Sequence, residues 1–191
     1  MAQDRLSIVN SALGMLGEQP IQSLDDGSLA GTTASRAYPV LMRSCLGSAP
    51  WTFAEKVVQL TADAKPARPD YAYSYERPMD HVVTRAVLEA DMTILRVRWR
   101  ISGRKICSDH AGIWLVYTFE APEQDWLDDF TLAVTYGMAH HLAGAITESA
   151  AKVEGYLALM QQQLAIARGR DAQQHPPEAL PMWSLVAWHT D

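Results

Sequence analysis

Apolar residues recur at helical spacing near the start of the chain. Positions three and four residues apart predict a helix over residues 4–16, which ends at Gly17. After a loop rich in glycine, serine and aspartate, a second apolar stripe predicts a helix over residues 34–46, capped by Thr33. Because Pro39 removes a backbone donor, we expect a kink or a later start in this helix.

Alternation of apolar and polar residues replaces this pattern in the middle of the chain and predicts strands. The clearest strand covers residues 95–101, where Trp99 and Ile101 point to one side and the intervening arginines to the other. A tight turn at Gly103 then starts a hairpin. Further extended segments are predicted over residues 56–60, 71–75, 105–108 and 113–119. An antiparallel meander is the natural arrangement of these strands.

Helical spacing returns near the end of the chain and predicts two long helices, over residues 125–147 and 149–168. In the first of them, Gly137 and several alanines allow close packing against a neighbouring helix. Acidic residues at its start favour the positive end of the helix dipole. Gly169 and the prolines beyond it predict the end of regular structure.

Together these elements predict an α+β fold. We expect a bundle of about four helices, two of them long and C-terminal, with an inserted antiparallel β-sheet and an extended C-terminal tail. The chain then divides into the N-terminal helices of the bundle (1–55), the inserted β-sheet region (56–120), the long helices (121–172) and the tail (173–191).

The composition is that of an ordinary globular protein, with 48% hydrophobic and 20% charged residues among 191. No apolar run approaches the about 20 residues of a membrane span, and the start does not predict a signal peptide. The two cysteines therefore indicate reduced thiols in a cytoplasm. The net charge of −6 argues against nucleic acid binding over the whole surface, although a local patch could still bind it.

No familiar catalytic signature occurs in the chain: it has no phosphate loop, nucleophile elbow, zinc-protease helix or paired CxxC motif. We therefore expect no catalytic residue, no cofactor and no metal site. His140 and His141 are adjacent, so on a helix they point about 100° apart and cannot share a metal in the usual way.

Two charged clusters and one aromatic cluster remain open to more than one interpretation. The arginine face of the predicted strand and turn could contact phosphates, carboxylates of a neighbouring subunit, or water. The acidic cluster could supply an acid–base pair or form a solvated helix start. The tyrosines could stack on bases or pack within the sheet. The arginine face comprises Arg96, Arg98, Arg100, Arg104 and Lys105, the acidic cluster Glu120, Glu123, Asp125, Asp128 and Asp129, and the aromatic cluster Tyr71, Tyr73 and Tyr75.

The tail after Pro177 is unusually apolar for a chain end. Tryptophan is costly to expose and is enriched at interfaces, so the tail either folds back on its own core or binds a partner. Its apolar residues are Leu180, Met182, Trp183, Leu185, Val186 and Trp188.

Several short motifs follow one another in a recognisable order. They are Asn10-Ser11-Ala12-Leu13, Leu16-Gly17-Glu18, Ile21-Gln22-Ser23-Leu24-Asp25-Asp26, Pro50-Trp51-Thr52-Phe53-Ala54, the stretch Tyr71–Asp80, Gly103-Arg104-Lys105-Ile106, and Trp126 with Phe130. In this order the chain resembles the tail tubular protein A family, the head-to-tail adaptors of short-tailed bacteriophages, over most of residues 5–170. It departs from the family pattern at Pro39, at His81 where a cysteine is common, and in its C-terminal tryptophan segment.

The resemblance implies a structural virion protein made in the host cytoplasm and located at the head-tail junction. Family members form a dodecameric ring between the portal protein and the tail nozzle protein, close the DNA-filled head, and let double-stranded DNA pass. Their C-terminal tail reaches into the portal. On this expectation residues 180–188 bind the portal, and the arginine face and acidic segment 125–129 join neighbouring copies. Two other functions stay open: a small cytoplasmic enzyme that uses the acidic cluster with His110 or His140, and a DNA-binding protein that uses the arginine face.

Overall fold

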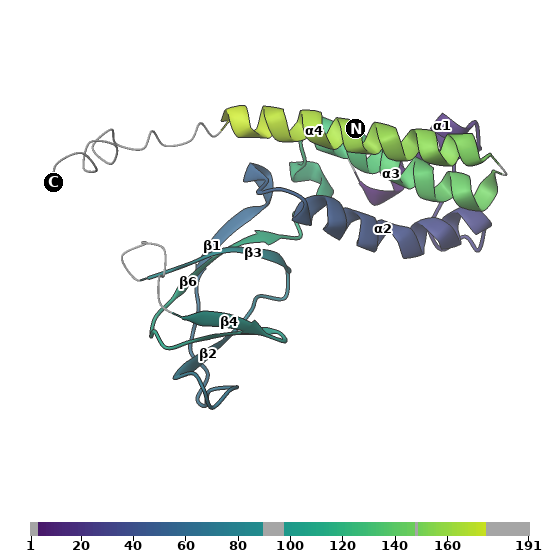
Figure 1. Cartoon of the computed structure of the whole chain (residues 1–191). Coiled ribbons are helices and arrows are strands. Elements are labelled where there is room, and N and C mark those ends of the chain that lie inside the picture. Colours follow the sequence, from purple (N-terminus) through teal and green to yellow (C-terminus); the bar gives the residue numbers. More distant parts are fainter. Residues whose placement is uncertain (1–3, 90–97, 148, 175–191) are drawn as a thin grey trace, which may run out of the picture.

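The computed structural model describes residues 4–89, 98–147 and 149–174 (Figure 1). The α+β fold class is confirmed. The helices are α1 (Arg5–Leu16), α2 (Leu29–Gly47), α3 (Asp128–Ile146) and α4 (Ala150–Gln174), with short 3-10 turns η1 (Thr52–Ala54) and η2 (Glu123–Asp125). The strands are β1 (Glu55–Gln59), β2 (Tyr73–Glu76), β3 (His81–Leu88), β4 (Trp99–Ser102), β5 (Lys105–Ser108) and β6 (Trp114–Phe119).

The helices form a bundle in which α3 is central and contacts α1, α2 and α4. Gly137 of α3 allows the closest approach: a β-carbon there would lie 2.7 Å from both Leu41 Cδ1 of α2 and Met160 Sδ of α4. Close packing at Gly137, expected from the sequence, is thereby confirmed. The predicted end of the first helix is also confirmed, because Gly17 caps α1 in the left-handed conformation with a φ of 83°.

Four packed aromatic rings of the bundle core join the start of the sheet region to the helices. The ring of Phe130 in α3 lies 4.9 Å from that of Trp51 and 5.0 Å from that of Trp126, both in edge-to-face geometry. Phe53 packs on the same ring at 5.1 Å. The segment before β1 is therefore part of the bundle core, and not a free linker.

The strands form two three-stranded antiparallel sheets instead of the expected single meander. Their orders are β1-β6-β3 and β2-β5-β4. β1 leaves the bundle and β6 leads back to it, and pairing of these two strands brings the ends of the insertion together. β3 was not predicted from the sequence. Its apolar residues do not alternate strictly, because two register irregularities interrupt its pairing with β6.

Two predicted boundaries were wrong. α2 begins at Leu29, where Ser28 accepts a hydrogen bond from the Gly31 amide, and Pro39 lies inside the helix. α4 continues through Gly169 to Gln174, because Asp129 and Thr52 hold its last turns from outside. The central predicted strand, residues 95–101, is described only from Arg98 on, and its residues 95–97 lie outside the described part of the chain.

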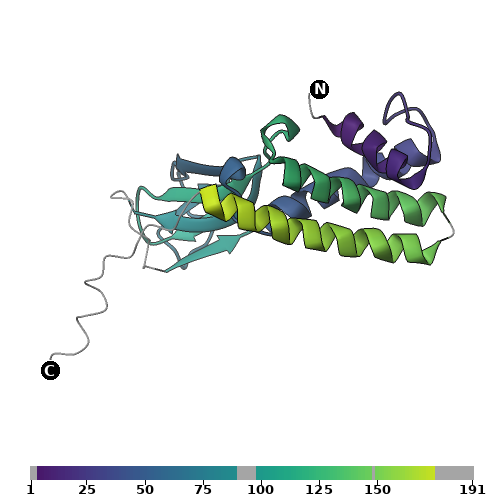
Figure 2. The ribbon, with the colours of Figure 1, turned by 90° about the horizontal axis from the view of Figure 1, so that it is seen from above.

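The bundle and the sheets meet at one end of the helices. In Figure 1 the sheets lie below that end, with β2 and β4 farthest from the helices. Viewed from above in Figure 2, α3 and α4 run side by side, and the last turns of α4 point toward the sheet end. The C-terminal end of α4 therefore lies near the junction of the two parts.

Candidate functional site

The arginine face of β4 is partly engaged within the subunit. The Arg98 guanidinium lies 4.3 Å from the centroid of the Tyr71 ring and 3.4 Å from the Asp109 carboxylate, and it donates to the Asp70 carbonyl. These contacts hold the loop before β2 against β4. Arg96, which the sequence placed on the same face, lies outside the described residues.

The two other arginines of this face differ in their surroundings. Arg104, in the turn after β4, forms an ion pair with Glu76 at 3.2 Å. Arg100 is exposed in the middle of β4, and no ion pair within the described ranges engages it. Among the described arginines of this face, Arg100 is therefore the one that can pair with a neighbouring molecule without first giving up an ion pair within its own subunit.

The apolar side of β4 is also exposed. Trp99 is 36% exposed and Ile101 is 42% exposed. Ser108 of β5 is the register partner of both Trp99 in β4 and Tyr73 in β2, so the three residues lie in one row across the sheet. Tyr73 is 37% exposed. Exposed aromatic and aliphatic side chains next to arginines are typical of protein interfaces.

Two of the three tyrosines of the aromatic cluster are buried in the sheet region. Tyr75 is fully buried between the two sheets, and its hydroxyl donates to the His110 carbonyl at 2.8 Å. Tyr71 is buried beneath Arg98. Packing within the sheet region is thus confirmed for these two tyrosines, and Tyr73 alone of the three is exposed.

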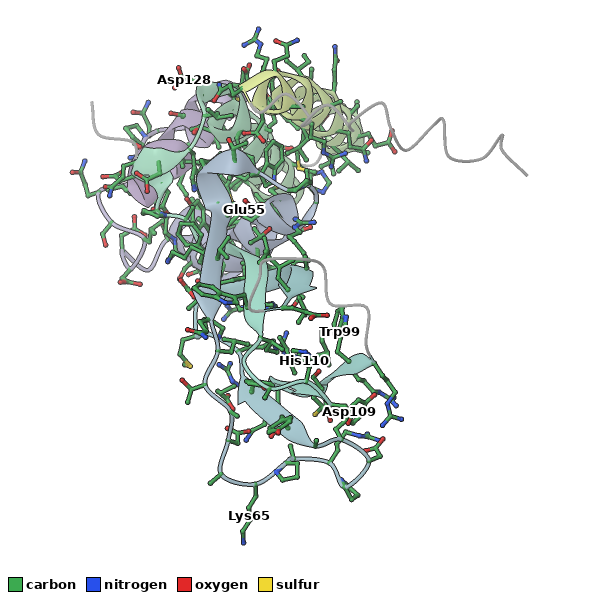
Figure 3. The ribbon with its side chains drawn as sticks, turned by 90° about the vertical axis from the view of Figure 1, so that its left-hand side faces the viewer. Glu55, Lys65, Trp99, Asp109, His110 and Asp128 are labelled. Atoms are coloured by element: carbon green, nitrogen blue, oxygen red, sulfur yellow. The ribbon has the colours of Figure 1, made fainter. Side chains whose placement is uncertain are left out.

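The acidic segment lies at the end of the bundle that carries the sheets, on the side of the helices away from β4. Figure 3 shows Asp128 at the far side of the bundle, whereas Trp99 and Asp109 lie in the sheet away from it. Asp129 is mostly buried, pairs with Arg170 of α4 and accepts a hydrogen bond from Gln163 at 2.9 Å. Asp129 thus stabilises the α3–α4 pair. Asp125 ends η2, and Asp128 stands in the first turn of α3.

In comparisons with known proteins, no family model and no curated protein matches this chain. Function is therefore inferred from the geometry of the described residues and from the order of the motifs.

The residues that an enzyme would have to combine are scattered. His110 lies 3.6 Å from Glu89 in the sheet part, and His140 of α3 contacts the Val153 carbonyl at 2.8 Å. Neither lies in the acidic segment around Asp128. Among the described residues there is no group of three or more histidines, cysteines or carboxylates that could hold a metal ion.

A pocket of about 470 Å³ lies between the last turns of α4 and the turn before η1. Asp171 on its wall is only 4% exposed, and its carboxylate accepts hydrogen bonds from the Thr52 amide at 3.0 Å and the Thr52 hydroxyl at 2.6 Å. No local pattern in the sequence indicates this pair, because the two residues are 119 positions apart. Asp171 connects the end of α4 to the Trp51 motif.

Both cysteines are free, and both are buried. Cys45 lies in α2, where burial raises the pKa of its thiol to about 11. Cys107 lies in β5, in the other part of the molecule. No helix within the described ranges is long and apolar enough to cross a membrane. The candidate portal-binding residues 180–188 lie outside the described part of the chain.

Proposed function

We propose that this protein is a non-enzymatic head-to-tail adaptor of a bacteriophage virion. Copies would form a ring between the portal protein and the tail nozzle protein, close the filled head and let double-stranded DNA pass. The helical bundle with its inserted strands supports the proposal, since the resemblance to the tail tubular protein A family implies this arrangement.

One observation carries the proposal: two motifs of the resemblance that are far apart in the chain share one core. Trp51 and Phe53 come from the motif after α2, whereas Trp126 and Phe130 come from the motif at the start of α3. The other three rings gather around Phe130 at centroid distances of 4.9 to 5.1 Å. The two motifs therefore contact each other in the fold, and an accidental resemblance would not require that contact.

The distribution of surfaces supports ring assembly. In a ring, one face of each copy contacts a different face of the next copy. The exposed strand β4, which contains Trp99 and Arg100, and the acidic start of α3 with Asp128 lie on two separate faces of the subunit (Figure 3). Opposite charges on two separate faces suit a head-to-tail contact. The net charge of −6 would help DNA to pass through the ring without adhering to it.

Electron microscopy of the full chain mixed with purified portal tests the proposal. We expect rings of this protein seated on one end of the portal, and a further layer when the nozzle protein is added. A portal that remains bare at micromolar concentrations of the chain would contradict the adaptor function.

A further inference from the structure

Three arginines from distant parts of the chain line one small pocket where the bundle meets the sheets. Arg43 comes from α2, Arg77 from the connection between β2 and β3, and Arg104 from the turn between β4 and β5. Pro78, His81 and Val82 complete the lining, and the volume is about 140 Å³. A cavity needs roughly 10–15 Å³ to hold one water, so this pocket has room for a small oxyanion with some of its hydration.

The positive charge of the pocket is only partly neutralised. Arg43 pairs with Glu120, and Arg104 with Glu76 at 3.2 Å. Neither carboxylate lines the pocket. Arg77 has no carboxylate partner within the described ranges, so three guanidinium groups face two carboxylates.

Arg77 is held in place by acceptors other than a carboxylate. Its guanidinium donates to the carbonyls of Gly103 and Arg104, and it lies 3.4 Å from His81 Nδ1. Since arginine can only donate, His81 Nδ1 accepts, and the ring proton is on Nε2, which lies 2.9 Å from the Thr84 hydroxyl. Burial, and then the charge of Arg77, lower the pKa of His81, which keeps the ring neutral at pH 7.

We propose that this pocket is a binding site for a phosphate-type oxyanion. A planar guanidinium fork matches the oxygens of phosphate, and an arginine already fixed in position loses little conformational entropy on binding. The three arginines belong to α2, to the β2–β3 connection and to the β4–β5 turn. A bound oxyanion therefore joins the bundle to both sheets.

Titration of the full chain with inorganic phosphate tests this site, with NaCl at equal ionic strength as the control. NMR signals of the His81 ring report on the pocket directly. We expect a saturable shift of these signals with phosphate, and a rise in the pKa of His81 because the bound anion offsets the charge of the arginines. Shifts no larger than those caused by NaCl would overturn the proposal.

Variants separate the site from general charge screening. Arg104→Gln removes a largely exposed guanidinium from the pocket and should weaken phosphate binding about tenfold, the effect of losing one hydrogen bond from a charged group. Arg100→Gln is the matched control, since Arg100 does not line the pocket, and it should bind as the wild type does. Equal affinity in the two variants would overturn the site.

Arg77→Lys provides a second variant that keeps the charge and loses the fork. Its phosphate affinity should fall while its backbone NMR spectrum stays that of a folded protein. A short DNA duplex added to the phosphate-loaded protein then identifies the source of the anion. Displacement of phosphate supports the site with nucleic acid backbone as its ligand, and absence of displacement supports it with the free ion.

Discussion

Two glycines of α3 differ in whether the packing of the bundle leaves room for a side chain. Gly137 lies where α3 touches both α2 and α4, so a methyl group there would overlap Leu41 and Met160 at 2.7 Å. Gly144, in the same helix, has no atom within 4 Å of where its β-carbon would be. One glycine is required by packing and the other is not.

Gly137→Ala should lower the free energy of unfolding by about 1–2 kcal/mol, since overpacking costs more than the gain in helix propensity. The cost is limited because the atoms that must move are side-chain ends. Urea unfolding measures it. Gly144→Ala is the matched control and should be neutral or stabilising by up to about 1 kcal/mol. Equal stability of the two variants would contradict this packing.

Two histidines give the protein a pH-dependent stability. Burial, and then the charge of Arg77, lower the pKa of His81 in the folded protein. Partial desolvation, and then the neighbouring His140, lower the pKa of His141, although this side chain still contacts solvent and its effect should be the smaller one. Both groups take up protons more readily when unfolded, where the pKa is near 6.5. Stability should therefore be fully present above pH 6.5 and decrease as the pH falls below it.

Unfolding in urea at pH 7.5 and pH 5.5, in phosphate-free buffer, checks this dependence. His81→Asn and His141→Asn should each reduce the loss of stability between the two pH values, because each removes one group that takes up protons on unfolding. A wild-type protein that is equally stable at both pH values would disprove the effect.

At the scale of elements, the attachment of the sheets to the bundle depends on a few polar contacts. Arg85 of β3 donates to the Thr118 hydroxyl of β6 at 2.8 Å and to the carbonyls of Gly47 and Ala49 at the end of α2. A helix C-terminus leaves its last carbonyls unpaired and favours a cation. Arg85 therefore caps α2 while it connects the helix to the β1-β6-β3 sheet.

Arg85→Met should lower the free energy of unfolding by about 2 kcal/mol, because several hydrogen bonds from a charged donor are lost and the carbonyls remain partly buried. Hydrogen exchange should quicken in the last turn of α2 and in β3 together. Arg100→Met, on the exposed strand β4, is the control and should leave exchange at both places unchanged. Faster exchange in β3 alone would mean that Arg85 does not link the two elements.

The whole molecule presents two separate surfaces of opposite charge, and the proposed ring uses both. The exposed side chains of Trp99, Arg100 and Ile101 lie on β4, and Asp128 lies beyond the opposite side of the bundle (Figure 3). Arg98 is less suited to a test of assembly because Tyr71 and Asp109 already engage it.

Arg100→Glu should weaken ring formation and leave the monomer folded, because it puts like charges at the proposed contact with the acidic start of α3. Analytical ultracentrifugation with portal present measures the ring, and circular dichroism checks the fold. Arg36→Glu, an exposed arginine of α2, is the control for charge alone. Rings that form equally well with Arg100→Glu would exclude β4 from the interface.

Deletion of residues 178–191 should leave a folded subunit with unchanged thermal stability that no longer binds the portal. The reason is that residues of α1, α2, α3 and α4 already form a core cluster of buried side chains with one another. Differential scanning calorimetry and a portal pull-down provide the two measurements. A truncated chain that melts earlier or aggregates would show that the tryptophans of the tail belong to the subunit's own core.

The sequence by itself determined the helices, the α+β class and the β4–β5 hairpin, because these depend on spacings within a few residues. Gly17 ends α1 as its position predicts, and Gly137 packs between helices. Only the tertiary structure decided the pairing of β1 with β6, the exposure of Trp99, the Asp171–Thr52 link and the gathering of Arg43, Arg77 and Arg104. Each of these features depends on how residues far apart in the chain are placed in space. A local pattern carries no information about which distant partner a side chain will meet.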